Sequence, residues 1–288
     1  MPTNEEEYFQ YLTERINVSL LEGFESVATD LEKAIRYALS VGGKRLRPVL
    51  FLTLIEGYGK SIDPYMDIAC GIEYIHTYSL IHDDLPVMDN DNFRRGMPTV
   101  HKEFNEPIAL LAGDTLLTMA IERISHAGIP ERKIVNILKI LTECIGPQGM
   151  AGGQALDLDF KGEKEMIFRI QRMKTADLIR GTMLCAAEVL DMSDDQKRGL
   201  ETAGILIGIA FQMTDDLLDL TGDEKEVGKK LQKDRHNESP NSVVFYGEEF
   251  IRDKIDYLYK RTLKTLQEIE IEFTHFLTLI KKMAFRNR

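Results

Sequence analysis

Residues 251–269, IRDKIDYLYKRTLKTLQEI, carry the clearest fold signal in the chain, because their apolar side chains follow one helical stripe. The stripe recurs at spacings of three and four residues, at Ile251, Ile255, Leu258, Thr262, Leu266 and Ile269. Such spacing marks one buried face of an α-helix. The same period appears near the start, at Leu12, Ile16 and Leu20, and no Asn-Gly or Asp-Gly pair joins alternating apolar runs. We therefore predict an all-α protein.

Prolines and capping residues divide the rest of the chain into further helices. We expect helices at about 5–39, 43–58, 63–85, 107–127, 131–146, 148–160, 163–191, 194–221 and 249–285. Asp63 is expected to cap the helix that Pro64 begins, and Ser193 with Gln196 reads as a capping box. Residues 86–106 and 222–248 are expected to be irregular. Since no Gly/Ser/Pro linker divides the chain, residues 1–288 are predicted to form a single domain.

Composition narrows the functional classes. The 288 residues are 43% hydrophobic and 29% charged, and their net charge is −11, which disfavours general binding to nucleic acid or anionic membranes. The three cysteines are far apart and predict neither a disulfide framework nor a zinc site. No signal peptide or membrane-spanning stretch is visible, so a cytoplasmic location is expected.

Two acidic clusters each end an apolar helical segment. The second is the simpler, because Asp215 and Asp219 are four residues apart and lie about 40° apart around a helix. Two carboxylates on one face repel each other, and a divalent cation such as Mg²⁺ would relieve that repulsion. Asp216 stands between them in the sequence.

The first cluster includes Asp83, Asp84 and Asp89. Asp83 and Asp89 would lie on opposite faces of a straight helix, but Pro86 makes a straight helix improbable there. A bulge at residues 85–87 would let the two carboxylates converge. Either cluster alone could be a solvated helix end, whereas two such clusters favour Mg²⁺ and a substrate with a diphosphate or triphosphate group.

Basic residues that could bind such phosphate groups occur in two segments. Gly42 and Gly43 precede Lys44 and Arg47 at a helix start, where backbone and dipole favour an anion. Arg94 and Arg95 follow the first cluster, and because adjacent side chains diverge they suit two phosphate sites better than one. Weaker candidates are Lys174 with Thr175, and Lys229.

Two aromatic residues precede the first cluster on the same predicted helix. His76 lies seven residues before Asp83, and it is as well explained by core packing as by phosphate contact. Tyr78 lies five residues before Asp83, or about 7.5 Å along a helix, where its ring could close the floor of an apolar tunnel. Core packing is the alternative for Tyr78 as well.

Together these motifs resemble the polyprenyl synthetase family over nearly the whole chain. The matching segments, beside both acidic clusters, are GGKRLRP at 42–48, EYIH at 73–76, SLIHDDLP at 79–86, NFRRG at 92–96, LAGD at 111–114, GQALDL at 153–158, KT at 174–175, FQ at 211–212 and the C-terminal RNR at 286–288. The resemblance implies an isoprenoid-synthase-type helical bundle around a central cavity. It implies a homodimer that condenses isopentenyl diphosphate with an allylic diphosphate, dimethylallyl or geranyl, to farnesyl diphosphate.

The resemblance also implies a role for each candidate residue. Three Mg²⁺ ions would be held by Asp83, Asp84, Asp89, Asp215, Asp216 and Asp219. The allylic diphosphate would contact Arg94, Lys174, Thr175, Gln212 and Lys229, and isopentenyl diphosphate would contact Lys44, Arg47, His76 and Arg95. No nucleic acid and no membrane is implied as a partner.

The chain departs from the family pattern in the 228–242 loop and at one further position. After Gly228 and Lys229 a second glycine is usual before Asp234, and residues 237–242 lack the usual Lys–Thr pair. Asn92 also stands where an Asp is common. Alternatives to farnesyl diphosphate synthesis are a geranyl or geranylgeranyl product, a terpene cyclase, and a non-catalytic subunit of a partner synthase. The GGKRLRP segment disfavours a cyclase, and the two intact acidic clusters disfavour a non-catalytic subunit.

Overall fold

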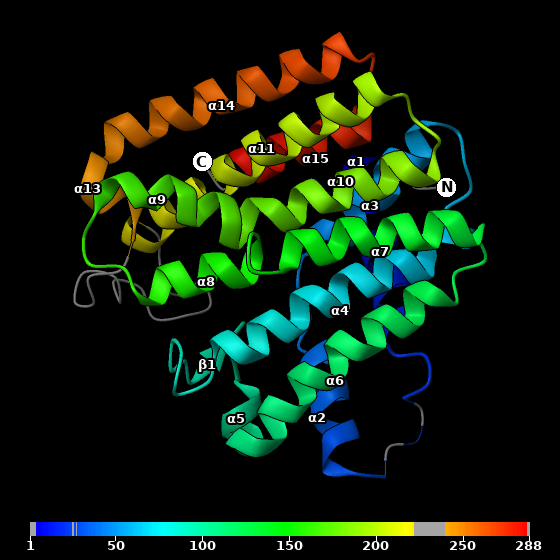
Figure 1. The fold of residues 1–288 in the computed structure, drawn as a ribbon, viewed down its shortest axis with the longest axis vertical. Coiled ribbons are helices and arrows are strands. Elements are labelled where there is room, and N and C mark those ends of the chain that lie inside the picture. The colour runs from blue at the N-terminus through cyan, green and yellow to red at the C-terminus, as the bar shows by residue number, and fades with distance from the viewer. Residues whose placement is uncertain (1–3, 25, 27, 222–239, 287–288) are drawn as a thin grey trace. The chain divides into compact units, whose positions relative to one another are not determined.

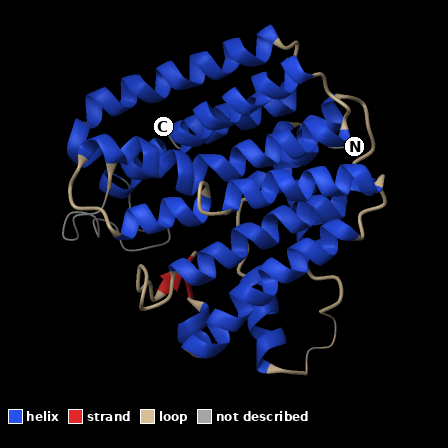
Figure 2. Ribbon diagram, in the orientation of Figure 1, coloured by secondary structure: helices blue, strands red, loops and turns tan. Residues whose placement is uncertain are grey.

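The computed structural model describes residues 4–24, 26, 28–221 and 240–286, and within these ranges almost all regular structure is helical (Figures 1 and 2). The exception is a two-stranded antiparallel hairpin of β1 (Phe93–Arg94) and β2 (Met97–Pro98). The all-α prediction is confirmed. None of the described helices combines the length and the apolar character needed to cross a membrane. The chain divides into two compact units, Met1–Leu52 with Ser61–Pro130 and Thr53–Lys60 with Glu131–Arg288.

The first unit is built on α4, a helix that is apolar on almost every side. Its helices are α1 (Glu5–Leu20), α2 (Asp30–Ser40), the start of α3 (Leu46–Gly57), α4 (Met66–Asp83), α5 (Val100–Glu103) and α6 (Glu106–Ser125). Helix α6 packs along α4. Glycines allow this close approach, because a Cβ at Gly113 would lie 2.1 Å from Nε2 of His82, and one at Gly71 would lie 2.5 Å from Cγ1 of Ile124.

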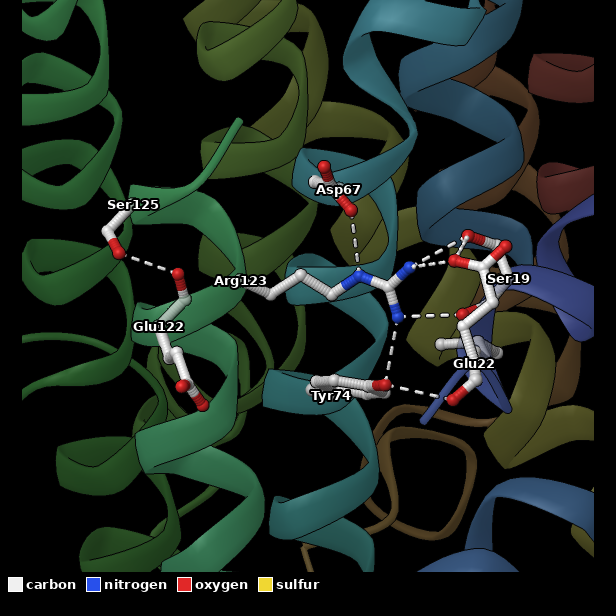
Figure 3. A network of polar contacts seen from close by, with 8 residues as sticks. Ser19, Glu22, Asp67, Tyr74, Glu122, Arg123 and Ser125 are labelled. Carbon is white, nitrogen blue, oxygen red and sulfur yellow. Dashed lines mark hydrogen bonds and ion pairs between the residues drawn. The ribbon is translucent and has the colours of Figure 1, made fainter. Parts of the chain in front are cut away.

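A partly buried polar network joins α1, α4 and α6 in this unit (Figure 3). Nε of Arg123 donates to Asp67, and its Nη1 donates to the carbonyl of Ser19 and to the hydroxyl of Tyr74. Nη2 pairs with Glu22 at 2.9 Å. Because the guanidinium meets two residues at or just after the end of α1 and two residues of α4, it ties both of these helices to α6.

Three sequence predictions for this unit are wrong. Residues 86–106 are not irregular throughout, because they contain β1, β2 and α5. The expected helix 5–39 is broken between α1 and α2, where Gly23 adopts φ +88° and Thr29 forms a capping box with Glu32. Asp63 does not cap a helix, since its carboxylate accepts a hydrogen bond from Arg15 at 2.6 Å. It is instead the first residue of the 3₁₀ turn Asp63–Tyr65 that leads into α4.

The second unit is a layer of long helices. It contains α7 (Glu131–Ile145), α8 (Met150–Leu158), α9 (Lys164–Gln171), α10 (Asp177–Val189), α11 (Asp194–Thr221), α13 (Ser242–Tyr246), α14 (Glu248–Glu268) and α15 (Thr274–Ala284). Helix α10 packs against α7 and α11, and α14 packs against α11 (Figure 1). The predicted bounds of α11 are confirmed, as is the capping box, in which Gln196 N–H donates to Ser193 Oγ at 3.3 Å.

Other boundaries in the second unit differ from the sequence predictions. The buried stripe of α14 is confirmed from Ile251 to Leu266, but the expected helix 249–285 is two helices, separated where Glu270 adopts φ +60°. The expected helix 163–191 contains a π-helical turn, Arg172–Ala176, between α9 and α10. Turns of this kind are frequent at functional sites.

Candidate active site

The first acidic cluster is shaped by a turn that folds back on the end of α4. The backbone N–H of Asp89 donates to the carbonyl of Asp83 at 2.9 Å, and that of Asp91 donates to the carbonyl of Asp84 at 3.2 Å. The predicted convergence of Asp83 and Asp89 is thus confirmed at the level of the backbone. Pro86 lies inside this turn, where it prevents α4 from continuing. Asp89 is exposed and Asp83 is half-buried.

Asp84 differs from its neighbours because it is buried and engaged by Arg94. Nε of Arg94 lies 3.0 and 2.9 Å from the two carboxylate oxygens, and Nη2 lies 2.6 Å from Oδ1. Burial raises the pKa of Asp84, while the hydrogen bonds from Arg94 oppose that rise. The guanidinium of Arg94 therefore supplies the counter-charge of this buried carboxylate.

Arg94 and Arg95 diverge, as the sequence predicts. They lie on a hairpin whose two turn residues, Arg95 and Gly96, have φ values of +53° and +78°, the pattern of a type I′ turn. Arg95 reaches the glycine pair before α3, where its Nη1 donates to the carbonyl of Gly42. A Cβ at Gly43 would lie 2.3 Å from that nitrogen, so only glycine admits the guanidinium here.

Two candidate residues for isopentenyl diphosphate, Arg47 and Arg95, lie close enough to His76 for their charges to act on its imidazole. Burial, followed by the charges of Arg47 and Arg95, holds the pKa of His76 well below its usual range. The imidazole is therefore neutral at pH 7 and surrounded by positive charge, an arrangement that suits an anion. Lys44 is exposed at the start of the same segment.

Arg45, which lies between Lys44 and Arg47 in the sequence, has a structural role. It is buried, pairs with Glu73 at 2.8 Å, and donates to Asn17 and to the carbonyl of Leu39. These bonds fix the glycine-rich segment to α1, α2 and α4. A small, partly open pocket in the first unit is lined by Tyr37, Val41, Thr77, Leu80 and Ile81, and also by Asp84, Arg94 and Arg95.

In the second cluster, Asp216 is buried, and the donors that meet its carboxylate within the described ranges are neutral. Its Oδ2 accepts from Gln171 at 2.8 Å and from the backbone and hydroxyl of Ser242 at 2.8 and 2.6 Å, and its Oδ1 accepts from Gln212 at 3.0 Å. Burial raises the pKa of Asp216 to about 6, because these hydrogen bonds only partly offset the loss of water. Asn241 caps α13 and also donates to the carbonyl of Asp216.

Several predicted diphosphate contacts meet beside Asp216. The hydroxyl of Thr175 donates to Gln212 at 2.8 Å, which links the π-helical turn to α11. Lys174 on the same turn is paired with Asp157 of α8. A Cβ at Gly153 would lie 2.3 Å from the backbone nitrogen of Lys174, so a glycine is needed where α8 approaches this turn.

Asp215 and Asp219 lie one turn apart near the end of α11, as predicted. Asp215 pairs with Arg286 at 3.0 Å, whereas Asp219 is 7% exposed. Both carboxylates lie in the last two turns of α11, where the helix dipole is negative and a cation is favoured.

The donor set suits Mg²⁺ that is shared with a ligand. Within the described ranges, no three His, Cys, Asp or Glu side chains converge on one point. Mg²⁺ is usually held by one or two carboxylates and completes its coordination with water and substrate phosphates. Paired carboxylates at the end of α4 and at the end of α11, each with basic residues close by, fit that requirement.

Tyr78 lies on α4 and is half-buried. Its ring meets the ring of His82 edge-on at a centroid distance of 5.9 Å. Burial raises the pKa of Tyr78 to about 12, so the phenol is neutral and its ring presents an apolar surface. Lys229 and most of the unusual 228–242 loop lie outside the described residues.

The sequence did not indicate the residues that hydrogen-bond to, or pair with, the predicted site residues. Gln171, Asn241 and Ser242 bind Asp216, Asp157 binds Lys174, and Arg286 binds Asp215. Asn241 and Ser242 lie where the Lys–Thr pair of the family is missing, so this departure retains a polar role. Sequence spacing could not reveal these contacts, because each residue lies at least 17 positions from the site residue that it binds.

Comparison with known proteins agrees with this geometry. The family model described as polyprenyl synthetase matches residues 28–274. Farnesyl diphosphate synthase of Micrococcus luteus is 37% identical over 280 residues, which cover 95% of each chain. That of Bacillus subtilis is 37% identical over 84% of each chain. A chloroplastic geranylgeranyl pyrophosphate synthase of Catharanthus roseus is 36% identical over 89% of this chain and 74% of its own.

Solved structures give the same result. The Helicobacter pylori geranyltransferase complexed with magnesium and isoprenyl diphosphate has a TM-score of 0.84 and 32% identity, with 98% of this chain and 97% of that chain covered. A farnesyl and geranylfarnesyl diphosphate synthase of Zymomonas mobilis has a TM-score of 0.85 and 30% identity, with 99% and 100% covered. The isoprenoid-synthase type of fold is therefore confirmed, and the chain belongs to the polyprenyl synthetase family of prenyltransferases.

Proposed function

We propose that this short-chain trans-prenyltransferase condenses isopentenyl diphosphate with dimethylallyl or geranyl diphosphate and releases farnesyl diphosphate. The observation that carries the proposal is the divergence of Arg94 and Arg95. One guanidinium lies on an aspartate of the first cluster and the other lies on the glycine pair before α3. The two adjacent guanidinium groups thus face two separate anion sites. A condensation of two diphosphate substrates requires two such sites.

Asp83, Asp84 and Asp89 of the first cluster, with Asp215, Asp216 and Asp219 of the second, are proposed to hold three Mg²⁺ ions together with the allylic diphosphate. The ions would supply the positive charge that stabilises the diphosphate as it leaves. The convergence of Asp83 with Asp89 and the shared helical face of Asp215 and Asp219 support this assignment. The magnesium and isoprenyl diphosphate of the Helicobacter pylori structure support it as well.

The side chains of this chain bind and orient the two substrates. Arg94, Lys174, Thr175, Gln212 and Lys229 are proposed to contact the allylic diphosphate and to stabilise the charge that develops on it when the allylic C–O bond ionises. Lys44, Arg47, His76 and Arg95 are proposed to hold isopentenyl diphosphate so that its alkene faces the allylic carbon. The proton lost after the carbon–carbon bond forms goes to the departing diphosphate, and apolar walls exclude water from the cation.

Tyr78 is proposed to limit the product to fifteen carbons. Its ring is braced against His82, which itself contacts the backbone carbonyl of Leu110 on α6 at 3.0 Å. A ring held from two helices resists displacement by a growing chain, whereas Ser79 beside it is too small to block one. This observation favours farnesyl over geranylgeranyl diphosphate as the product.

The chain is further proposed to act as a cytoplasmic homodimer and as a single domain of residues 1–288. Leu110, Leu111 and Ile121 of α6 are between 44% and 49% exposed, which supports burial of this helix against a second copy.

Product analysis tests the proposal. The purified chain is incubated with Mg²⁺, isopentenyl diphosphate and each allylic diphosphate in turn, and the prenyl products are identified by chromatography and mass spectrometry. We expect farnesyl diphosphate from dimethylallyl and geranyl diphosphates, and products of twenty or more carbons from Tyr78→Ala. A geranyl or geranylgeranyl product from the unaltered chain would replace the farnesyl assignment, and a cyclic hydrocarbon or no product would refute the condensation.

A further inference from the structure

Arg286, near the C-terminus, occupies the second acidic cluster. Its Nη1 lies 3.0 Å from Oδ1 of Asp215, and its guanidinium lies 3.5 Å from the ring centroid of Phe211. Phe211 and Asp215 are four residues apart on α11 and so share one face. One guanidinium therefore stacks on the first residue and pairs with the second.

The chain around Arg286 is anchored at this position. The hydroxyl of Thr214 donates to the carbonyl of Ala284 at 2.7 Å in a buried hydrogen bond, and the ring of Phe285 packs edge-on against Tyr259 at 4.9 Å. These contacts hold the end of α15 against α11 and α14. The pairing of Arg286 with Asp215 is thus built into the fold of the second unit.

The pairing is nevertheless incomplete. Nε and Nη2 of Arg286 are buried and have no hydrogen-bond acceptor among the residues that the structure describes. By contrast, Arg94 gives both Nε and Nη2 to Asp84. Buried donors without acceptors cost free energy, so they destabilise the pairing of Arg286 with Asp215. This single contact is therefore easier to displace than the bidentate pairing of Arg94 with Asp84.

We propose that Arg286 is a positioning residue that neutralises Asp215 when no metal is bound and competes with a divalent cation for that carboxylate. The inference rests on the proposed function, because it takes Asp215 as a metal ligand. Arg286 then lowers the affinity of the second cluster for metal alone, and its departure from Asp215 accompanies metal binding.

Direct metal binding tests this competition without turnover. Mn²⁺ binding to the full chain, without substrate, is measured by electron paramagnetic resonance for the unaltered protein, Arg286→Gln, Arg286→Lys and the control Lys281→Gln. Lys281 is exposed on α15 and carries the same charge, so its loss reports general electrostatics. We expect Arg286→Gln to bind Mn²⁺ about three- to tenfold more tightly, Arg286→Lys to lie between, and Lys281→Gln to be nearly unchanged.

A double-mutant cycle with Asp215→Asn locates the effect, because the gain from Arg286→Gln should vanish when Asp215 is no longer charged. Equal affinity in the unaltered chain and Arg286→Gln would overturn the inference, and so would a gain that persists in Asp215→Asn. A different result would refute the proposed function instead: if Asp215→Asn does not weaken Mn²⁺ binding at all, Asp215 is not a metal ligand.

A second measurement needs no variant. If metal displaces Arg286, amide hydrogen exchange at Ala284–Arg286 of the unaltered chain should accelerate at saturating Mn²⁺. Exchange that stays the same or slows would also overturn the competition.

Discussion

The two acidic clusters both bring carboxylates close together, but they do so through different local structures. In the first, a turn after α4 brings Asp83 and Asp89 together through a backbone hydrogen bond of 2.9 Å. In the second, helical periodicity alone places Asp215 and Asp219 on one face of α11. Each cluster has an arginine on one carboxylate, but Arg94 holds Asp84 by three short contacts and Arg286 holds Asp215 by one.

This difference indicates in which cluster the charge of the buried carboxylate is already balanced by the fold. Asp84 is buried with its counter-charge, so the first cluster has a fixed internal ion pair. Asp216 is buried, its donors in the part of the chain that the structure describes are neutral, and its pKa is raised to about 6. The first cluster therefore carries one buried negative charge that is already neutralised, whereas Asp216 of the second cluster becomes charged only as the pH rises past about 6.

The largest expected effect comes from removing one carboxylate from either cluster. Asp83→Asn and Asp215→Asn should each lower kcat/KM by roughly 10³-fold, because the leaving diphosphate loses a share of its stabilising charge. Asp195→Asn, an exposed change at the start of α11, should leave kcat/KM unaltered. Full activity in either cluster variant would show that only one cluster serves the reaction.

The adjacent arginines test whether the first cluster serves one substrate or two. Arg94→Ala should lower kcat/KM mainly for the allylic diphosphate, and Arg95→Ala mainly for isopentenyl diphosphate, each by about 10- to 100-fold. Arg94→Ala should also lower the free energy of unfolding, since it leaves Asp84 buried without its counter-charge, and denaturant titration reports that loss separately. Equal losses for both substrates in both variants would show that the two-site assignment is wrong.

The raised pKa of Asp216 predicts a pH dependence specific to the second cluster. Below a pKa of about 6 the carboxyl holds a proton in the folded protein, so a cation must displace that proton. Mn²⁺ affinity should therefore fall about tenfold for each pH unit below 6 and become level above pH 7. Titrations between pH 5 and 8 check this, and a midpoint that persists in Asp216→Asn would assign it to another group.

The smallest expected effect concerns the support of the second cluster by α13. Asn241→Ala should reduce the free energy of unfolding by about 1 kcal/mol, because it removes a helix cap that also donates to the carbonyl of Asp216. It should also weaken Mn²⁺ binding slightly. Asn4→Ala is the matched control, since Asn4 caps α1 in the first unit, and it should cost similar stability without any change in Mn²⁺ affinity. An equal loss of Mn²⁺ affinity in both would argue against a role for α13.

The sequence by itself determined the helical class, the bounds of α11 and the shared face of Asp215 and Asp219. These features depend on local periodicity, which repeats every 3.6 residues and is readable in one segment. The divergence of Arg94 and Arg95 could also be predicted, because adjacent side chains leave the backbone in different directions. The break between α14 and α15 was harder to predict, since Glu270 adopts φ +60° in a stretch that contains no glycine.

Only the tertiary structure decided how each acidic residue is partnered. Asp216 lies 26 residues before Ser242 and 45 after Gln171, and Arg286 lies 71 positions beyond Asp215. Spacing carries no information over such distances, because helix packing and chain reversals set which side chains meet. Burial is likewise a tertiary property, so the raised pKa of Asp216 and the lowered pKa of His76 follow from packing that no single segment specifies.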